Sequence, residues 1–306
     1  MTIIMSITKD QIKELAKSLG MDLCGVGSVD RFETSPEGKH PCDILPGCKS
    51  VIVIGARLLD GVIQANFRAF EDGRRNLKGI YGTYGYAMLP NFELTYSCYA
   101  IARFIEGNSE AAATPCSTGP MTNGMQISIR HSAVAAGLGQ FGHMGIVLTP
   151  EYGPRNRFGV ILTTLEIEPD PMYDGPELCN RCGVCAKVCP TGALKAPEDG
   201  GLAHVEIGDK SYDYCVVHFA KCRKALQAMT KDLGGDGDYL TEKEPTLEDL
   251  FEAEKRMPID GVGLQHINSW NCGRCQTYCP AGQWSARFKK TGLSKGPKSV
   301  FIEEKL

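Results

Sequence analysis

"CNRCGVCAKVCPTGAL", residues 179–194, is the stretch of sequence that says most about the fold. Its cysteines follow the pattern C-x2-C-x2-C-x3-C-P, at Cys179, Cys182, Cys185 and Cys189. Three thiolates spaced in this way surround one face of an iron–sulfur cubane, while the fourth points toward a second cluster. Zinc is the main alternative, but it usually takes cysteines as two separated pairs. The stretch therefore predicts ligands to two [4Fe-4S] clusters.

A weaker copy of the pattern, "CGRCQTYCP", occupies residues 272–280 and has only three cysteines. A full copy would have another cysteine where Ser269 stands, and a hydroxyl is a poor iron ligand. The missing thiolate must come from elsewhere, and the segment between the motifs offers Cys215 and Cys222. We choose Cys215, in "SYDYCVVHF", and keep Cys222 as the alternative.

With this choice the ligands form two sets of four. One cluster is held by Cys179, Cys182, Cys185 and Cys279. The other is held by Cys189, Cys215, Cys272 and Cys275. The remaining cysteines show no ligand spacing and are expected to be small buried hydrophobes or inert thiols; they are Cys24, Cys42, Cys48, Cys98, Cys116 and Cys222.

Hydrophobic periodicity divides the chain into helices and strands. Residues 8–19 place apolar side chains at helical spacing, between Thr8 as N-cap and Gly20 as a stop. Short β-branched runs predict buried strands at 50–58 and 157–167. Further helices are expected at 92–106, 126–136, 215–230 and 246–256.

The segment 166–177, "EIEPDPMYDGPE", is rich in proline and acidic residues and has the composition of a linker. It divides the chain into an α/β (α+β) domain over residues 1–170 and a cluster domain over residues 171–285. We expect a helical insertion at about 211–265 in the second domain. A locally basic tail over residues 286–306 follows.

Composition and charge limit the partners and the cellular location that we expect for the protein. The 306 residues carry a net charge of −3, so nothing in the overall balance calls for a polyanionic partner, and we expect no nucleic acid partner. No run of eighteen apolar residues predicts a membrane helix, and no signal peptide opens the sequence. Despite the 14 cysteines, the expected location is therefore the cytoplasm.

Three further stretches complete a resemblance. They are "GVGSVDRF" (25–32), "HPCDILPGCKSVIVIGARL" (40–58) and "AGLGQFGHMGIVLTPEYGPRNR" (136–157). In this order before the cysteines, they resemble the epoxyqueuosine reductases and the corrinoid-dependent reductive dehalogenases over roughly residues 8–284. The resemblance implies a cobalamin bound in a nitroreductase-like domain, followed by a ferredoxin-like domain with two [4Fe-4S] clusters that reduce it.

The third stretch is rich in glycine, with Gly137, Gly139, Gly142 and Gly145 between a predicted helix and a strand. Absent side chains permit unusual backbone angles and close approach of the backbone to a bulky ligand. The stretch contains G-x-G-x-x-G, but it follows a helix and not a strand, which argues against a dinucleotide site. A purely structural turn is the other alternative.

By the resemblance, the backbone of Gly139–Gly145, with His143 and Met144, faces the corrin ring. The nearby Arg155 is implied to lie near the phosphate of the nucleotide tail. His143 stands where the relatives carry lysine or arginine, so a fixed cation is replaced by a group that titrates near neutral pH. A structural role for this histidine is the alternative.

The resemblance also implies a proton donor, an aspartate or tyrosine, from the segment at residues 81–106. No aspartate is present in it. Glu93 or Tyr86 is the expected replacement, with Asn91 at the aspartate position if the alignment shifts by two residues. Arg130 is expected to hold an anionic group of the substrate or cofactor. For each of these side chains an ordinary structural role is the alternative.

Together these features predict a cytoplasmic cobalamin-dependent reductase that acts on a small molecule and takes electrons from an external donor such as ferredoxin or flavodoxin. One alternative is a ferredoxin-like electron-transfer or corrinoid-reducing protein that serves a partner enzyme. The other is an epoxyqueuosine reductase acting on tRNA. We disfavour the latter because the sequence ends about 27 residues after Cys279, without the helical-repeat tail of those enzymes. Respiratory dehalogenation is disfavoured by the missing export signal.

Overall fold

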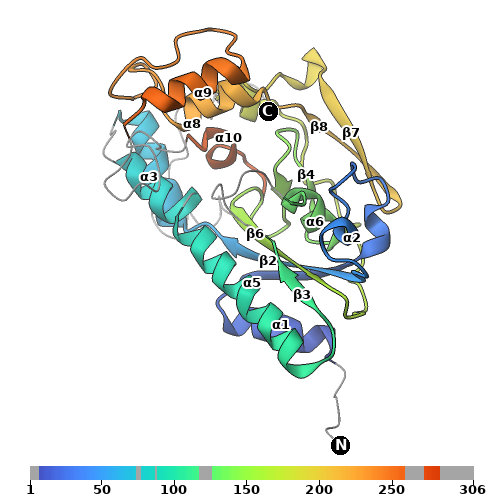
Figure 1. The fold of residues 1–306 in the computed structure, drawn as a ribbon. Coiled ribbons are helices and arrows are strands. Elements are labelled where there is room, and N and C mark those ends of the chain that lie inside the picture. Colours follow the sequence, from blue (N-terminus) through green and yellow to red (C-terminus); the bar gives the residue numbers. More distant parts are fainter. Residues whose placement is uncertain (1–6, 74–76, 87, 117–125, 259–271, 283–306) are drawn as a thin grey trace, which may run out of the picture.

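A four-stranded antiparallel sheet forms the centre of the molecule (Figure 1). The computed structural model describes residues 7–73, 77–86, 88–116, 126–258 and 272–282. In spatial order the strands are β1 (Leu23–Ser28), β2 (Ser50–Arg57), β6 (Asn156–Thr163) and β3 (Ala113–Pro115). Both predicted strands are confirmed as β2 and β6, which pair with each other. The predicted mixed α/β fold class is confirmed as well.

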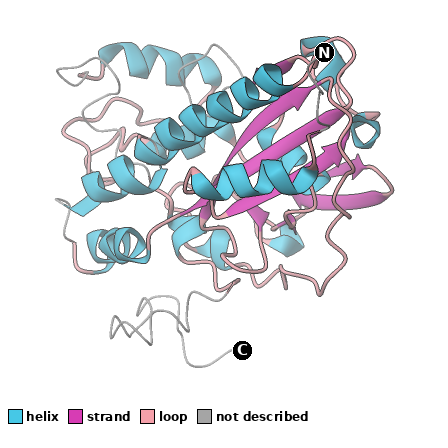
Figure 2. Cartoon of the chain, turned by 90° about the horizontal axis from the view of Figure 1, so that it is seen from below, coloured by secondary structure: helices cyan, strands magenta, loops and turns pink. Residues whose placement is uncertain are grey.

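The two central strands are buried on both faces, as their unbroken β-branched runs predict. On one face, α1 (Lys9–Ser18) and α5 (Leu89–Asn108) pack on the sheet. On the other face lies α6 (Ile129–Ala135). Figure 2 shows helices lying across the strands.

The ends of the predicted helices follow local rules. A capping box at Thr8 and Gln11 begins α1, and Gly20 follows its end with a φ of 87°, as predicted. The helix predicted at 92–106 is α5 and begins three residues earlier, because Pro90 suits a first helical turn. The helix predicted at 126–136 is α6, whose N-cap is Ser128.

Three short elements lie between β2 and α5. They are α3 (Asp60–Glu71), α4 (Lys78–Tyr81) and the π-helix η3 (Gly82–Tyr86). Single π-helical turns are uncommon and occur often at functional sites. The smaller elements of this half are η1 (Val29–Phe32), α2 (Pro41–Ile44), β4 (Gln140–Phe141) and β5 (Val147–Leu148).

The cysteine motifs lie on short helices, α7 (Val184–Lys187) and α10 (Arg274–Thr277). Between them the chain forms η4 (Pro197–Asp199), a hairpin of β7 (Leu202–Ile207) and β8 (Lys210–Cys215), and the helices α8 (Phe219–Leu226) and α9 (Leu247–Arg256). The prediction of a helix from residue 215 is corrected, since the alternating burial of residues 210–215 is that of a strand.

The two halves of the chain share apolar cores. One of these combines Leu58, Phe67 and Tyr81 with Val188 and Tyr278. The predicted boundary near residue 170 falls in a segment without helix or strand, and the division into domains stays a prediction. The predicted basic tail lies outside the described residues. Within the part of the chain that is described, no helix is both long and apolar enough to cross a membrane.

Candidate iron–sulfur and corrinoid site

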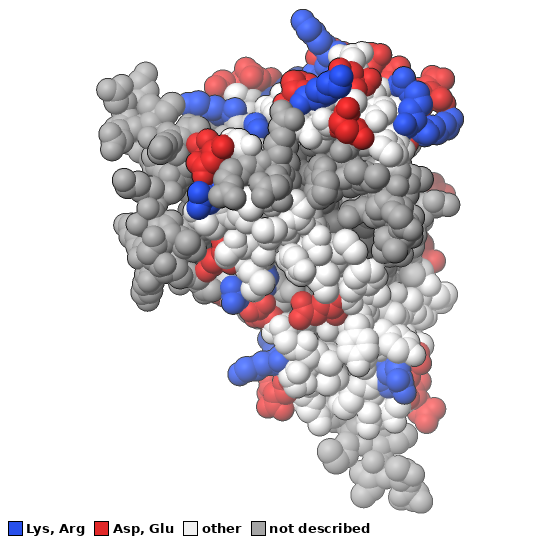
Figure 3. Space-filling model, turned by 90° about the vertical axis from the view of Figure 1, so that its left-hand side faces the viewer, with Lys and Arg blue, Asp and Glu red and all other residues white. Residues whose placement is uncertain are grey.

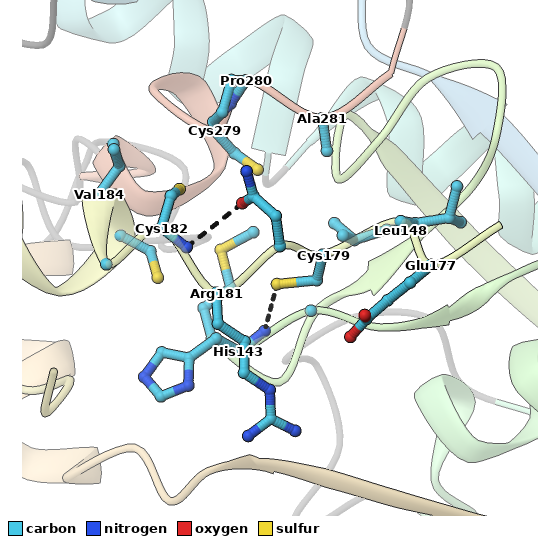
Figure 4. A pocket seen from close by; sticks show the side chains of 16 residues that line it. His143, Leu148, Glu177, Cys179, Arg181, Cys182, Val184, Cys279, Pro280 and Ala281 are labelled. Atoms are coloured by element: carbon cyan, nitrogen blue, oxygen red, sulfur yellow. Dashed lines mark hydrogen bonds between the residues drawn. The ribbon is translucent and has the colours of Figure 1, made fainter. Parts of the chain in front are cut away.

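The first cluster site consists of Cys179, Cys182, Cys185 and Cys279, the four thiols predicted to act together. They line one cavity of about 280 Å³. Figure 4 shows side chains from the two motifs converging on it, with Gly142–Met144 of the glycine-rich stretch at its wall. The structure thus brings together cysteines that lie up to 100 positions apart in the sequence. A cavity lined by four thiols suits a cubane cluster.

Backbone geometry places these thiols. Arg181 and Gly183 adopt left-handed conformations, with φ of 53° and 73°, just before α7. Gly273 does the same before α10, with φ of 56°. The two short helices contact each other, so both motifs curl around a common centre. The repeated C-x2-C spacing is therefore folded in the same way in each motif.

Burial makes Cys185 and Cys279 poor acids without a metal. It raises the pKa of Cys185 to about 12, and the nearby Cys279 adds to the effect. Burial also raises the pKa of Cys279 to about 11. Because metal ligands must be deprotonated, binding of iron would release protons here and tie cluster assembly to the packing of both motifs.

His143 is a neighbour of the first cluster site. Its backbone N–H donates to Sγ of Cys179 at 3.3 Å, and its Nε2 lies 2.9 Å from the carbonyl oxygen of Lys195. The side chain is only 3% exposed. His143 also lines the cavity of the first cluster site, and its role toward a cofactor stays a prediction.

Cys222 lies in the electrostatic environment of the second motif. Burial raises the pKa of Cys222 to about 11, and the next contributions come from Cys272 and Cys189. Burial likewise raises the pKa of Cys275, followed by Cys272 and Cys222. The side chain of Thr191, two residues after Cys189, donates to the backbone oxygen of Lys221, beside Cys222. These interactions support Cys222, the alternative ligand.

Cys215, our first choice from the sequence, ends β8 and is fully buried. It belongs to an apolar cluster with Met144, Leu148 and Leu194, and Cys275 of the second motif packs against the same cluster. Its Sγ lies 3.6 Å from the carbonyl oxygen of Val216. Cys215 and Cys222 thus both lie near the second motif, and the identity of the fourth ligand stays a prediction.

The N-terminal half contributes polar side chains that the sequence did not reveal as site residues. Asn66 donates to the carbonyl oxygen of Cys272 at 3.2 Å and to Oγ1 of Thr277 at 3.0 Å. The hydroxyl of Tyr81 donates to Oε1 of Gln276 at 2.9 Å. These bonds fasten α10 to α3 and α4. No local motif marks them, since each joins residues about 200 positions apart.

The glycines predicted to admit a bulky ligand pack against the chain itself. A Cβ on Gly139 would lie 1.9 Å from the carbonyl oxygen of Leu148, and one on Gly137 would lie 2.2 Å from that of Pro171. A Cβ on Gly145 would lie 2.9 Å from the Arg130 guanidinium. At these positions the close approach is therefore between segments of this protein.

Tyr86, a predicted proton donor, ends the π-helix and is half-buried. The Arg157 guanidinium carbon lies 4.7 Å from the centre of its ring. Arg157 also donates to Oδ1 of Asn91 at 2.8 Å. The structure thus brings Tyr86 and Asn91 together through an arginine that the sequence had not singled out.

The other two predicted catalytic residues have different surroundings. Glu93 is exposed, and partial burial followed by the nearby Asp22 raises its carboxyl pKa. Arg130 donates to the backbone oxygen of Gly145 at 2.5 Å and lies over the ring of Tyr214. These contacts of Glu93 and Arg130 are with residues other than Tyr86, Arg157 and Asn91.

Several large apolar side chains in the segments next to η3 are exposed. They are 37–53% exposed and comprise Leu59, Ile80, Tyr84, Leu89 and Phe92. Figure 3 shows areas without charged side chains among the described residues of this side of the molecule. Where exposed apolar side chains gather in one patch, they mark a binding surface.

Comparison with known proteins agrees with this site. A family model described as a 4Fe-4S binding domain matches residues 172–195. A tetrachloroethene reductive dehalogenase of Desulfitobacterium hafniense is 37% identical over 103 residues, which are 33% of this chain and 17% of that protein. The epoxyqueuosine reductase of Bacillus subtilis (strain 168) is 26% identical over 298 residues, 89% of this chain and 63% of that protein.

Solved structures of both groups share the fold. A Bacillus subtilis epoxyqueuosine reductase structure has a TM-score of 0.51 at 19% identity, over 89% of this chain and 64% of that one. The catabolic reductive dehalogenase NpRdhA has a TM-score of 0.53 at 16% identity, over 98% of this chain and 38% of that one. This is thus an iron–sulfur protein of the fold that these reductases share. Its homologues are epoxyqueuosine reductases and reductive dehalogenases, of whose length it spans less than two thirds.

Proposed function

We propose that the protein is a cytoplasmic cobalamin-dependent reductase in which two [4Fe-4S] clusters pass low-potential electrons to a corrinoid. The observation that carries this proposal is the cavity in which Cys179, Cys182 and Cys185 meet Cys279 of the second motif. Cysteine-ligated cubanes reach potentials of about −700 mV, low enough for such a task. An external donor such as ferredoxin or flavodoxin would supply the electrons.

The ligands that we propose follow the two sites. Cys179, Cys182, Cys185 and Cys279 would hold the first cluster. Cys189, Cys222, Cys272 and Cys275 would hold the second. A pure electron carrier would have no use for the 170 residues before its clusters, nor for the exposed apolar side chains in the segments next to η3.

The corrinoid is proposed to cover the exposed apolar side chains in the segments next to η3, where it would supply a strongly reducing metal centre. The phenol of Tyr86 would donate the proton that reduction of the substrate consumes. The Arg157 guanidinium lies over the ring of Tyr86 and would hold the phenol in position. Asn91 holds that guanidinium by accepting its hydrogen bond.

The proposed substrate is a small organic molecule with a reducible bond, such as a halogenated one, since a tyrosine stands at the position expected for the donor. Epoxyqueuosine in tRNA is the second candidate. The observation that favours it is the match to an epoxyqueuosine reductase along 298 residues, against 103 for the dehalogenase. That reading would require a nucleic acid partner.

The test is anaerobic reconstitution with iron, sulfide and hydroxocobalamin, followed by gel filtration. The proposal predicts about eight iron atoms and one corrinoid per chain, with a cobalt(II) EPR signal that changes when substrate is added. Iron retained without corrinoid would instead support an electron carrier. Parallel assays of halide release from haloarenes and of queuosine formation in epoxyqueuosine-containing tRNA separate the two substrates.

A further inference from the structure

Arg155 lies just before β6 and is directed at the second cysteine motif. Its Nη1 donates to the carbonyl oxygen of Cys279 at 3.1 Å, and its Nη2 donates to that of Ala281 at 2.7 Å. The residue is only 2% exposed. The planar fork of the guanidinium thus bonds to two carbonyl groups within the protein, while the implied role of Arg155 beside a cofactor phosphate stays a prediction.

The charge of Arg155 is unusually far from water. Burial lowers its pKa to about 9, while Cys279 and then Asp60 act in the opposite direction. Arginine is rarely so buried unless anionic groups compensate its charge. The Cys279 thiolate, present once a cluster is bound, is one such group.

The loop that carries Arg155 meets the same segment a second time. A Cβ on Gly153, whose φ is 56°, would lie 2.2 Å from the carbonyl oxygen of Ala281. A Cβ on Gly282 would lie 2.4 Å from the backbone nitrogen of Gly153. The backbone at Gly153 therefore packs directly on the backbone of Ala281 and Gly282. This contact fixes the distance between the Arg155 loop and the segment whose carbonyl groups the guanidinium binds.

We propose that Arg155 is a positioning residue for the first cluster, which clamps the Cys279 ligand loop through two carbonyl groups and raises the reduction potential of that cluster. A reduced cluster carries one more negative charge than an oxidised one, so a fixed cation nearby favours the reduced form. The inference rests on the two-cluster assignment proposed above. With the Arg155 cation beside it, the first cluster is easier to reduce than it would be with its cysteine ligands alone.

Two variants separate the charge from the clamp. Arg155→Gln keeps a donor but removes the charge, whereas Arg155→Lys keeps the charge but lacks the two-pronged fork. Redox titration followed by EPR measures both cluster midpoints. Iron release to a chelator measures how firmly the ligand loop is held. Total iron per chain is measured first, because a wild-type value near four would refute the two-cluster assignment and not this inference.

For Arg155→Gln, we expect the midpoint of one cluster to fall so far that its reduced-to-oxidised ratio at the wild-type midpoint drops at least tenfold, about 59 mV. For the other cluster, this ratio should change by less than threefold. For Arg155→Lys, the ratio should change by less than threefold for both clusters, while chelators should remove iron faster than from the wild-type protein. Unchanged midpoints in Arg155→Gln would overturn the electrostatic role.

Arg31→Gln is the matched control. Arg31 also donates to a backbone oxygen, that of Ala135, and its pKa is also lowered by burial, but it packs beneath the β7–β8 hairpin. Its removal should leave both midpoints unchanged. If the Arg155→Gln variant does not assemble its clusters, the Arg155→Lys variant still tests the proposal. A tenfold change in the reduced-to-oxidised ratio of its first cluster at the wild-type midpoint would refute charge as the cause. Iron release at the wild-type rate would refute the clamp.

Discussion

The identity of the fourth thiol in the second cluster site depends on single residues. Cys222 interacts with Cys189 and Cys272, whereas Cys215 is fully buried in an apolar cluster against which Cys275 also packs. Replacing Cys222 by serine should lower iron from about eight to about four atoms per chain, because a hydroxyl binds iron poorly. Cys215→Ser serves as the matched control and should keep all the iron. The opposite pattern in iron analysis would restore Cys215 as the ligand.

The proposed proton donor can also be tested at this scale. Tyr86→Phe keeps the ring beneath Arg157 but removes the acid, so turnover should fall by about 10²–10⁴-fold with iron and corrinoid retained. Tyr96→Phe, on an exposed tyrosine of α5, is the control and should stay active. If Glu93→Gln abolishes turnover and Tyr86→Phe does not, the donor is the carboxyl group.

Sequence was sufficient for local chemistry and insufficient for distant contacts. The C-x2-C spacing pointed to three thiols of the first cluster site, because Cys179, Cys182 and Cys185 follow one another in a single loop. The contacts of Arg155 and His143 could not be predicted. Both have long-range partners, at Cys279 and at Lys195, that no local pattern encodes.

At the scale of an element, α6 carries a partly buried histidine near its N-terminus. His131 meets Ser128 at its N-terminus and makes edge contacts with the rings of Phe141 and Tyr214. Burial, and next the charge of Arg130, lowers the pKa of His131 to about 4. The imidazole is therefore neutral in the folded protein over a range where an unfolded chain would bind a proton.

This pKa predicts a loss of stability in acid. The contribution of neutral His131 is complete above about pH 6.5 and is lost as the pH falls toward 4. The full effect is on the order of 3 kcal/mol, since one pKa unit corresponds to about 1.4 kcal/mol. Urea unfolding at pH 7.5 and 4.5 measures it. His131→Gln should unfold with a weaker pH dependence, and an unchanged dependence would refute this assignment.

A hydrogen bond attaches α10 to α4, and its contribution to stability can also be tested. Tyr81 is fully buried, and its hydroxyl is bonded to Gln276. Tyr81→Phe leaves a buried polar group without its partner, which should cost about 1–3 kcal/mol of unfolding free energy. Tyr84→Phe, at an exposed position of the same segment, should change it by less than about 0.5 kcal/mol. Equal losses in both variants, measured by chemical denaturation, would contradict the attachment.

Elements were predicted best where their signals are local. The helix α1 and the strand β2 agree with their predicted ranges within a residue or two, because a capping box and an unbroken apolar run define them. The hairpin ending at Cys215 was missed. Its exposed strands carry few apolar residues, and the helical pattern of α8 was extended back over it.

For the whole molecule, the order of the strands and the joining of the two halves could not be predicted. The strands β2 and β6 pair although about 100 residues separate them, and Tyr81 shares an apolar core with Val188 and Tyr278. Such contacts place the first cluster site against the glycine-rich stretch of the other half. The account therefore requires that both clusters assemble in the intact chain.

The central claim is that eight thiols hold two cubane clusters in one chain. Mössbauer spectroscopy of protein reconstituted with ⁵⁷Fe under anaerobic conditions, together with iron analysis, tests it most directly. The account predicts about eight iron atoms per chain, all in the [4Fe-4S] form. About four iron atoms per chain, or bound zinc in place of iron, would contradict it.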